Sequence, residues 1–266
     1  MRLNEFYQIA DALAPKALSD EYCARYGAYD NSGILIDTGD RIKGVVFSLD
    51  LSHGAIEKAL QTGANLILTH HPAIYGKIAD IKADEYLGEK IIKCVKNGIS
   101  VVAMHLNLDC VNGGVDECLA QGVCRSAGRE QPVCEIMHSL ERGGYGRAYD
   151  IGNIPLRDLV ENIKKTFKTS RVLVYGDEEK KVGRVASFCG AGADEQAIAF
   201  ALSQGADIVV SSDFKHHIVQ LAIEKGLGVI ALTHYASECY GFEKYYQKIR
   251  LSVPVPCEYH TDENML

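Results

Sequence analysis

Residues 55–69 read AIEKALQTGANLILT, and residues 197–211 read AIAFALSQGADIVVS. Both copies follow the pattern A-I-x-x-A-L-x-x-G-A-[N/D], which is typical of a helix that ends at a glycine, and the apolar residues that follow predict a strand. The copies are offset by 142 residues, and no gap is needed to align them. A helix–glycine–strand unit is common, so this match alone indicates little about the fold.

A second similarity follows each copy. Residues 98–104 read GISVVAM and residues 226–232 read GLGVIAL, now with an offset of 128, so the loop after the first strand is longer by about fourteen residues in the first copy. Two matches in the same order predict an internal duplication that produces two similar lobes.

Short β-branched runs alternate with helical periods along the chain. The runs that predict strands are Val45–Leu49, Leu66–Leu68, Val101–Met104, Val172–Val174, Val185–Phe188, Ile208–Val210 and Val229–Leu232. The segments that predict helices are Ala55–Gln61, Leu87–Lys96, Leu156–Phe167, Glu195–Ser203 and Ile218–Glu224. This alternation predicts an α/β fold with mixed, largely parallel sheets covered by helices. We expect the first lobe to span residues 1–126 and the second to span residues 127–266, with the boundary in the Gly-, Arg- and Glu-rich segment Gly128–Tyr149.

Composition excludes several classes of function. A net charge of −7 and a pI near 5.7 argue against nucleic acid as the main partner, because phosphate binding needs clustered Lys and Arg. No apolar run approaches the roughly eighteen residues that a membrane-spanning helix needs. The first fifteen residues resemble an amphipathic helix rather than a secretion signal. The nine cysteines include no CxxC pair, which indicates reduced thiols, and we expect the protein in the cytoplasm.

Histidines and carboxylates gather where the predicted strands end. In open parallel sheets ligands bind beyond the carboxyl ends of the strands. His70 and His71 follow one strand directly, Asp109 follows the next strand of that lobe, and His234 follows a strand of the second lobe. Glu238 lies four residues after His234 in a segment that resembles a helix, so both side chains share one helix face.

Together these residues predict a pair of divalent metal ions. His70 and His71 can diverge onto two neighbouring ions, Asp109 can bridge them, and His234 and Glu238 supply the remaining protein ligands. Three imidazoles with two carboxylates suit Zn, Mn, Fe or Ni better than Ca or Mg. Such a set leaves open positions for water, which two ions about 3.5–4 Å apart would activate as hydroxide.

Each motif also has an interpretation without metal. An HH dipeptide is more often solvated or packed in a core, and a His-x-x-x-Glu pair is explained as well by an ion pair on a helix surface. Asp109 could cap the helix that follows it. The joint occurrence of these motifs at strand ends favours the metal site.

The chain resembles the Nif-three-like family, whose members are often called GTP cyclohydrolase 1 type 2 homologues. The matching motifs are Asp30–Gly33, Leu49–Asp50, Asn65–Pro72 with its Thr-His-His-Pro, His105–Asp109 followed by Gly113–Gly114, Cys189–Gly192, and His234–Tyr235 with Glu238. The resemblance implies a dinuclear metal site at His70, His71, Asp109, His234 and Glu238 in a cleft between the two lobes. It also implies a ring-shaped homohexamer assembled as a trimer of dimers.

The chain departs from the family pattern at three places. Ser211–Asp213 replaces the usual Thr-Gly-Glu, Thr233 replaces the glycine before His-Tyr, and Ala191 lies between the glycines of the turn. The middle domain of longer family members is absent as well. These departures affect the expected substrate contacts more than the metal ligands.

Other residues near the strand ends have two interpretations. His105 is a candidate acid–base, a group that orients a ligand, or simply a polar strand end. Asp213 corresponds to His71 by the offset of 142 and could face the same cleft. Asp50 could contact the site or cap a helix. The turn Cys189–Ala193 is better explained as a tight turn than as a phosphate site, because two acids follow it. His216 and His217 are expected on a helix, away from the ions.

Two functions fit this sequence. The first is a metal-dependent hydrolase that uses a metal-bridged water on a small nucleotide-like or heterocyclic substrate. The second is a non-catalytic assembly or regulatory protein that stores, delivers or senses metal. No residue pattern identifies a purine pocket or GTP as the substrate.

Overall fold

The structure, a computed structural model, describes residues 1–266 and divides into two compact units. Unit 1 comprises Met1–Val111 and Phe242–Asp262, and unit 2 comprises Asn112–Gly241 and Glu263–Leu266. These bounds differ from the expected ranges 1–126 and 127–266 in two ways: the helix Val115–Ser126 belongs to unit 2, and the end of the chain returns to the first sheet. There β11 (Cys257–Tyr259) pairs in parallel with β2 (Val45–Ser48).

Unit 1 contains a five-stranded sheet in the order β1-β4-β3-β2-β11. Only β1 (Gly33–Ile36) is antiparallel to its neighbour, β4 (Ser100–Ala103), whereas β3 (Leu66–Thr69) pairs in parallel with both β2 and β4. Every residue of β2, β3 and β4 is buried. This burial on both faces explains why these strands are nearly continuous apolar runs.

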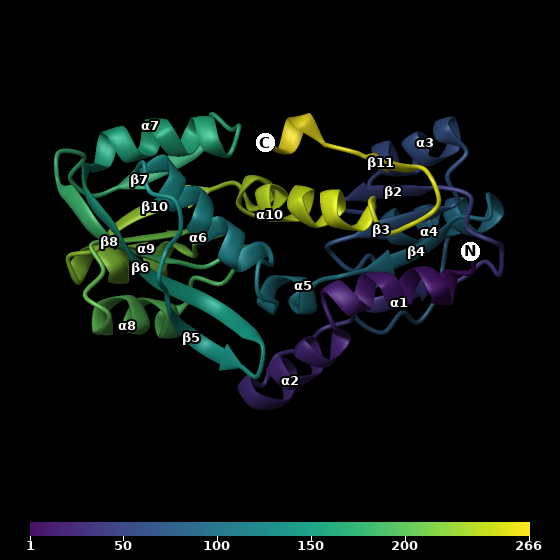
Figure 1. Ribbon diagram of the computed structural model, residues 1–266, viewed down its shortest axis with the longest axis horizontal. Helices are drawn as coiled ribbons and strands as arrows, with labels where there is room; N and C mark the ends of the chain where they lie inside the picture. Colours follow the sequence, from purple (N-terminus) through teal and green to yellow (C-terminus); the bar gives the residue numbers. More distant parts are fainter. The chain divides into compact units, whose positions relative to one another are not determined.

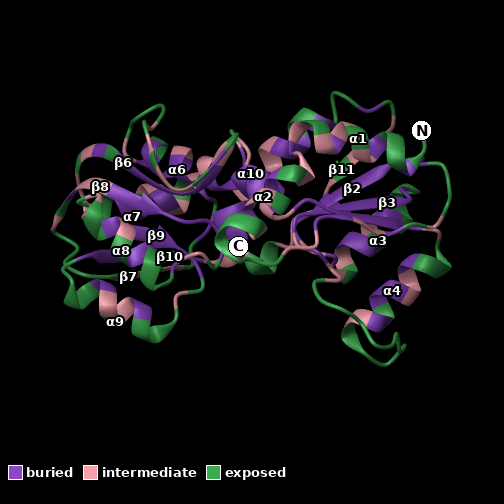
Figure 2. Ribbon diagram, turned by 90° about the horizontal axis from the view of Figure 1, so that it is seen from below, coloured by how far each residue is buried: buried purple, intermediate pink, exposed green.

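Helices cover both faces of this sheet. The helices of unit 1 are α1 (Leu3–Leu13), α2 (Lys16–Tyr26), α3 (His53–Thr62), α4 (Tyr86–Lys96) and the short α5 (Leu106–Cys110). Figure 2 shows α3 and α4 on one face of β2 and β3, and α1 on the opposite face. Ile56 of α3 and Ile91 of α4 pack with Val46 and Ile67 in one apolar core.

Unit 2 contains a six-stranded sheet in the order β5-β6-β8-β9-β10-β7. Its strands are β5 (Glu135–Leu140), β6 (Gly143–Pro155), β7 (Val172–Tyr175), β8 (Lys181–Ser187), β9 (Ile208–Ser211) and β10 (Gly228–Leu232). Its helices are α6 (Val115–Ser126), α7 (Leu156–Thr166), α8 (Glu195–Ser203), α9 (His216–Glu224) and the start of α10 (His234–Ile249), with a 3-10 turn at Glu263–Met265. The division between the units falls inside α10, after Gly241. None of the helices is both long and apolar enough to span a bilayer.

The two sheets repeat one arrangement, as the internal duplication predicts. In unit 2 the strands β7-β10-β9-β8 follow the same order as β1-β4-β3-β2 in unit 1. The directions also agree, because β7 is antiparallel to β10 while β8, β9 and β10 are parallel. The predicted α/β fold with two similar lobes is therefore confirmed.

The segment Gly128–Tyr149, expected to hold the lobe boundary, instead enters the antiparallel hairpin of β5 and β6 in unit 2 (Figure 1). Its glycines obscured the strand pattern. Gly144 and Gly146 have φ values of +145° and +74°, and a Cβ on Gly146 would crowd the ring of Phe188. Close packing and backbone conformation therefore require glycine where a strand signal needs an alternating side chain.

A buried ion pair connects α6 to this hairpin. Nε of Arg147 lies 3.0 Å from Oδ2 of Asp116, and both side chains are buried. The same oxygen accepts a hydrogen bond from the backbone N–H of Gly146 at 3.0 Å. Oδ1 of Asp116 accepts from the N–H of Cys189 at 3.2 Å, so one carboxylate joins the helix, the hairpin and the turn after β8.

Removing one partner of this pair should destabilise the protein strongly. Arg147→Met leaves the charge of Asp116 buried without its cation, and we expect the free energy of unfolding to fall by about 3–5 kcal/mol. Urea denaturation followed by circular dichroism measures this change, since the chain contains no tryptophan. The control is Arg157→Met, because Arg157 pairs with Glu179 on the surface of the same unit. This substitution should lower the free energy of unfolding by less than about 1 kcal/mol. Equal destabilisation by the two variants would contradict the stabilising role of the buried pair between Arg147 and Asp116.

Candidate metal centre

His70 lies directly after β3 and is completely buried. Its Nδ1 lies 2.7 Å from the carbonyl oxygen of Met104, which can only accept a hydrogen bond, so Nδ1 carries the proton. Nε2 is then the basic nitrogen, and it lies 3.4 Å from Oδ1 of Asp109. Asp109 is buried on α5. The structure thus brings these two predicted ligands together within unit 1.

His71 is held in the same way by a carboxylate. Its Nδ1 lies 2.8 Å from Oδ1 of Asp50. Both His70 and His71 donate their backbone N–H groups to the carbonyl of Leu49, and this turn lets two adjacent side chains diverge. Ser52, rather than Asp50, caps α3 by accepting from the N–H of Ala55 at 3.1 Å. Of the two interpretations of Asp50, the structure therefore shows a contact with His71 and no cap on α3.

His105 completes a cluster of three imidazoles in unit 1. Candidate ligand atoms of His70, His71 and His105 all lie within 4.8 Å of one another. The ring centroid of His105 is 5.3 Å from that of His70 and 5.9 Å from that of His71. His105 is therefore close enough to exchange protons with a group bound at His70 and His71.

Asp30 orients His105. Its Oδ1 lies 2.8 Å from Nδ1 of His105, while its Oδ2 accepts hydrogen bonds from the hydroxyls of Ser19 at 2.5 Å and Ser32 at 2.6 Å. Burial alone would raise the pKa of Asp30, but the hydrogen bonds from His105, Ser19 and Ser32 hold that pKa well below its usual range. Asp30 is therefore an anion at neutral pH. The sequence indicates Asp30 only as part of a family motif, and no spacing in the sequence predicts its hydrogen bond to His105.

In unit 2, His234 and Glu238 lie in the first turns of α10. Nε2 of His234 lies 3.1 Å from Oε1 of Glu238, and Glu238 is buried. The predicted pairing of these residues on one helix face is thus confirmed. Nδ1 of His234 lies 2.6 Å from Oδ2 of Asp213, which has a left-handed backbone with φ of +50°. Asp213, which the sequence analysis suggests could face the same cleft as His71, therefore orients His234.

The two carboxylates set the charge of His234. Burial alone lowers the pKa of His234, but hydrogen bonding and charge from Glu238, followed by those from Asp213, outweigh burial and raise the pKa to about 9. Without a cation, the imidazole is therefore protonated near neutral pH and pairs with both acids. A metal ion at Nε2 would replace that proton, so binding would release protons to solvent.

The turn Cys189–Ala193 supports this half of the site. Gly190 has a φ of +57°, and a Cβ there would collide with Oε1 of Glu238. Its N–H donates to the hydroxyl of Ser237 at 3.2 Å, and its carbonyl accepts from the hydroxyl of Ser212 at 2.6 Å. Because these backbone groups are occupied within the protein, the tight-turn interpretation fits better than a phosphate site. His216 and His217 are exposed on α9, as expected.

One feature is common to the four histidines. In His70, His71, His105 and His234, an oxygen that accepts hydrogen bonds holds Nδ1: a carbonyl for the first and an aspartate for each of the others. This arrangement fixes the ring orientation and leaves Nε2 as the basic nitrogen, as in most histidines that bind metals. The donor set of imidazole and carboxylate groups therefore fits divalent metal ions.

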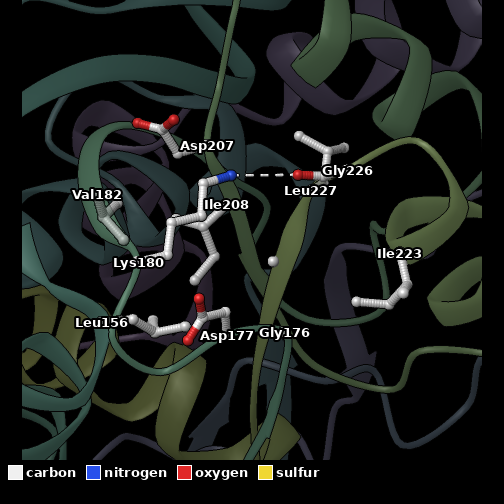
Figure 3. Close-up of a pocket in the computed structure, with 11 residues that line it drawn as sticks. Leu156, Gly176, Asp177, Lys180, Val182, Asp207, Ile208, Ile223, Gly226 and Leu227 are labelled. Atoms are coloured by element: carbon white, nitrogen blue, oxygen red, sulfur yellow. Dashed lines mark hydrogen bonds between the residues drawn. The ribbon is translucent and has the colours of Figure 1, made fainter.

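A separate pocket lies at the opposite edge of the unit 2 sheet. It has a volume of about 220 Å³ and adjoins Ile208 and Gly228, which begin β9 and β10. Its walls are mainly apolar, and Figure 3 shows Nζ of Lys180 donating to the carbonyl of Gly226 at 3.2 Å. The pocket contains no histidine or thiol, and His234 and Asp213 follow the other ends of these strands.

Curated relatives match almost the whole chain. A GTP cyclohydrolase 1 type 2 homolog from Clostridium acetobutylicum is 28% identical over 244 residues, which cover 90% of this chain and 85% of the relative. A protein of the same name from Methanocaldococcus jannaschii is 29% identical over 247 residues, which cover 92% of this chain and 93% of the relative.

Solved structures share the fold. The Staphylococcus aureus hypothetical protein SA1388 superposes with a TM-score of 0.82 at 23% identity, over 98% of this chain and 96% of that one. Reduced HcgD from Methanocaldococcus jannaschii gives a TM-score of 0.77 at 26% identity, over 97% of each chain. The family model of Duf34/NIF3 (NGG1p interacting factor 3) matches residues 1–261. This chain is therefore a member of the Duf34/NIF3 family.

Proposed function

We propose that this protein is a metal-dependent hydrolase in which His70, His71, Asp109, His234 and Glu238 together hold two divalent ions. The observation that carries the proposal is the fixed orientation of each imidazole, since an oxygen acceptor at Nδ1 leaves Nε2 as the basic nitrogen that can bind a cation. Three separate aspartates orient three histidines: Asp50 holds His71, Asp30 holds His105 and Asp213 holds His234. Histidines that only fill space in a core do not need such partners.

Both units contribute ligands in this proposal. Unit 1 supplies His70, His71 and Asp109, which are too few to hold two ions that usually take four or more ligands each. Unit 2 supplies an imidazole and a buried carboxylate from His234 and Glu238. The remaining positions would be open to water and substrate. The mixed nitrogen and oxygen donors favour Zn, Mn, Fe or Ni over Ca or Mg.

The residues around the ligands have defined tasks. When bound, two ions would lower the pKa of water and stabilise negative charge that develops on the substrate. His105, whose Nδ1 is held by the anionic Asp30, would accept a proton from the attacking water at Nε2 and return it to the leaving group. Asp50 and Asp213 keep His71 and His234 in the tautomer that binds metal.

The name of the relatives suggests a substrate class, which we carry over to this chain as a proposal. Relatives are called GTP cyclohydrolase 1 type 2 homologs, and opening a heterocyclic ring requires water at an amidine-like carbon. We therefore infer a small nucleotide-like or heterocyclic substrate without specifying GTP. The absence of disulfides among the nine cysteines supports our proposal of a cytoplasmic location. The homohexamer stays a prediction that light scattering can check.

Metal content tests whether the units share one centre. We expect protein purified without chelators or a metal-affinity tag to hold about two ions per chain by elemental analysis. Asp109→Asn and Glu238→Gln should each lower metal binding, since the proposed centre would take ligands from both units. The matched control is His216→Gln, which removes an exposed histidine from unit 2 and should leave metal content unchanged. If Glu238→Gln left the ions held by His70 and His71 unaffected, a shared centre would be excluded.

Turnover tests the role of His105. Metal-loaded protein is incubated with nucleotides, phosphodiesters and cyclic amides, and His105→Gln should lower the turnover number by about 10²–10⁴-fold without reducing metal content. Asp30→Asn should cause a smaller loss, about 10–100-fold, because it removes orientation rather than the proton acceptor. Full activity of His105→Gln would refute the proton-transfer role. No turnover of any substrate, despite stoichiometric metal, would favour metal storage, delivery or sensing instead.

A further inference from the structure

Two tyrosines of unit 1 are exposed next to the histidine cluster. Tyr29 is 54% exposed and Tyr75 is 49% exposed. Tyr75 lies in the connection from β3 to α4, residues 70–85, whereas the equivalent connection in unit 2 consists of residues 212–215. The longer loop of the first copy carries Tyr75, whereas the short connection of the second copy carries Phe214.

The pair is held in a defined geometry despite its exposure. The ring centroids of Tyr29 and Tyr75 are 5.2 Å apart with an interplanar angle of 84°. The hydroxyl of Tyr75 donates to the carbonyl of Tyr29 at 2.8 Å, and Nδ2 of Asn31 donates to the carbonyl of Ile74 at 2.5 Å. Two perpendicular rings form a corner, so a planar ligand that lies on one ring meets the edge of the other.

A series of ring contacts connects this corner to the proposed metal ligands. The centroid of Tyr75 is 6.2 Å from that of His105 with an interplanar angle of 90°. His105 in turn lies 5.3 Å from His70 and 5.9 Å from His71, measured between ring centroids. A group bound at the tyrosines would therefore be adjacent to the residues to which we assign the chemistry.

We propose that Tyr29 and Tyr75 form an aromatic shelf that binds the planar heteroaromatic ring of the substrate beside His105. This proposal rests on the proposed function and specifies its substrate class. Ring stacking explains why two large apolar surfaces are held in place but left uncovered, whereas a core role would bury them. Stacking on the shelf would favour planar rings over ligands without a ring, but it would not distinguish one planar ring from another. The rest of the ligand would extend toward the histidines.

Ligand binding tests the shelf directly. Guanosine 5′-monophosphate and ribose 5-phosphate differ by the base, so their affinities for zinc-loaded protein, measured by calorimetry, isolate the contribution of the ring. We expect the nucleotide to bind at least about tenfold more tightly, and Tyr75→Ala to weaken nucleotide binding by about ten- to hundredfold. The affinity for ribose 5-phosphate should not change in Tyr75→Ala. Saturation-transfer NMR should show its strongest effect on the base proton.

Matched variants separate the ring from the fold and from the metal. Tyr75→Phe keeps the ring but loses the bond to Tyr29, so its loss of affinity should be smaller than that of Tyr75→Ala. Tyr86→Ala removes a tyrosine of unit 1 that is 74% exposed elsewhere and should behave as wild type. The titrations are repeated on metal-free protein, and the zinc content is measured separately. The zinc content tests the proposed metal centre. The ratio of the affinities for guanosine 5′-monophosphate and ribose 5-phosphate tests the shelf. Equal affinity for the two ligands, or unchanged nucleotide affinity in Tyr75→Ala, would overturn the shelf.

Discussion

The hydrogen bond at Nδ1 of each histidine is the interaction on which the proposed site depends. An imidazole without such a partner can rotate and can carry its proton on either nitrogen. Here a carbonyl or an aspartate holds Nδ1 of His70, His71, His105 and His234. Because the aspartates lie at other strand ends or in other loops, the fold itself determines which nitrogen can bind a cation.

The duplicated sheet explains where these groups lie. Strands β2, β3 and β4 of unit 1 and strands β8, β9 and β10 of unit 2 run in parallel, so in each unit their carboxyl ends meet at one edge. Asp50, His70 and His105 follow the three strands of unit 1. In unit 2 the corresponding strand ends are followed by the Gly190 turn, Asp213 and His234, although not at residue-for-residue equivalent positions. The two sheets therefore present equivalent edges that carry different side chains.

Much of this could be predicted from the sequence. Repeated helix–glycine–strand patterns predicted the two similar lobes, because burial on both faces makes parallel strands visible as apolar runs. The His234–Glu238 pair was predicted because helical spacing is local. The unit bounds could not be predicted, since the return of β11 to β2 depends on pairing between distant segments. The hairpin of β5 and β6 was missed because its glycines remove the alternating side chains. The Asp30–His105 bond was missed because no sequence spacing indicates it.

The most direct test of the account is a crystal structure of metal-loaded protein with anomalous scattering measured at the metal edge. We predict two peaks about 3.5–4 Å apart, with His70, His71 and His234 bound through Nε2 and each Nδ1 still hydrogen-bonded to its oxygen. A single peak, or coordination through Nδ1 of these histidines, would contradict the central claim.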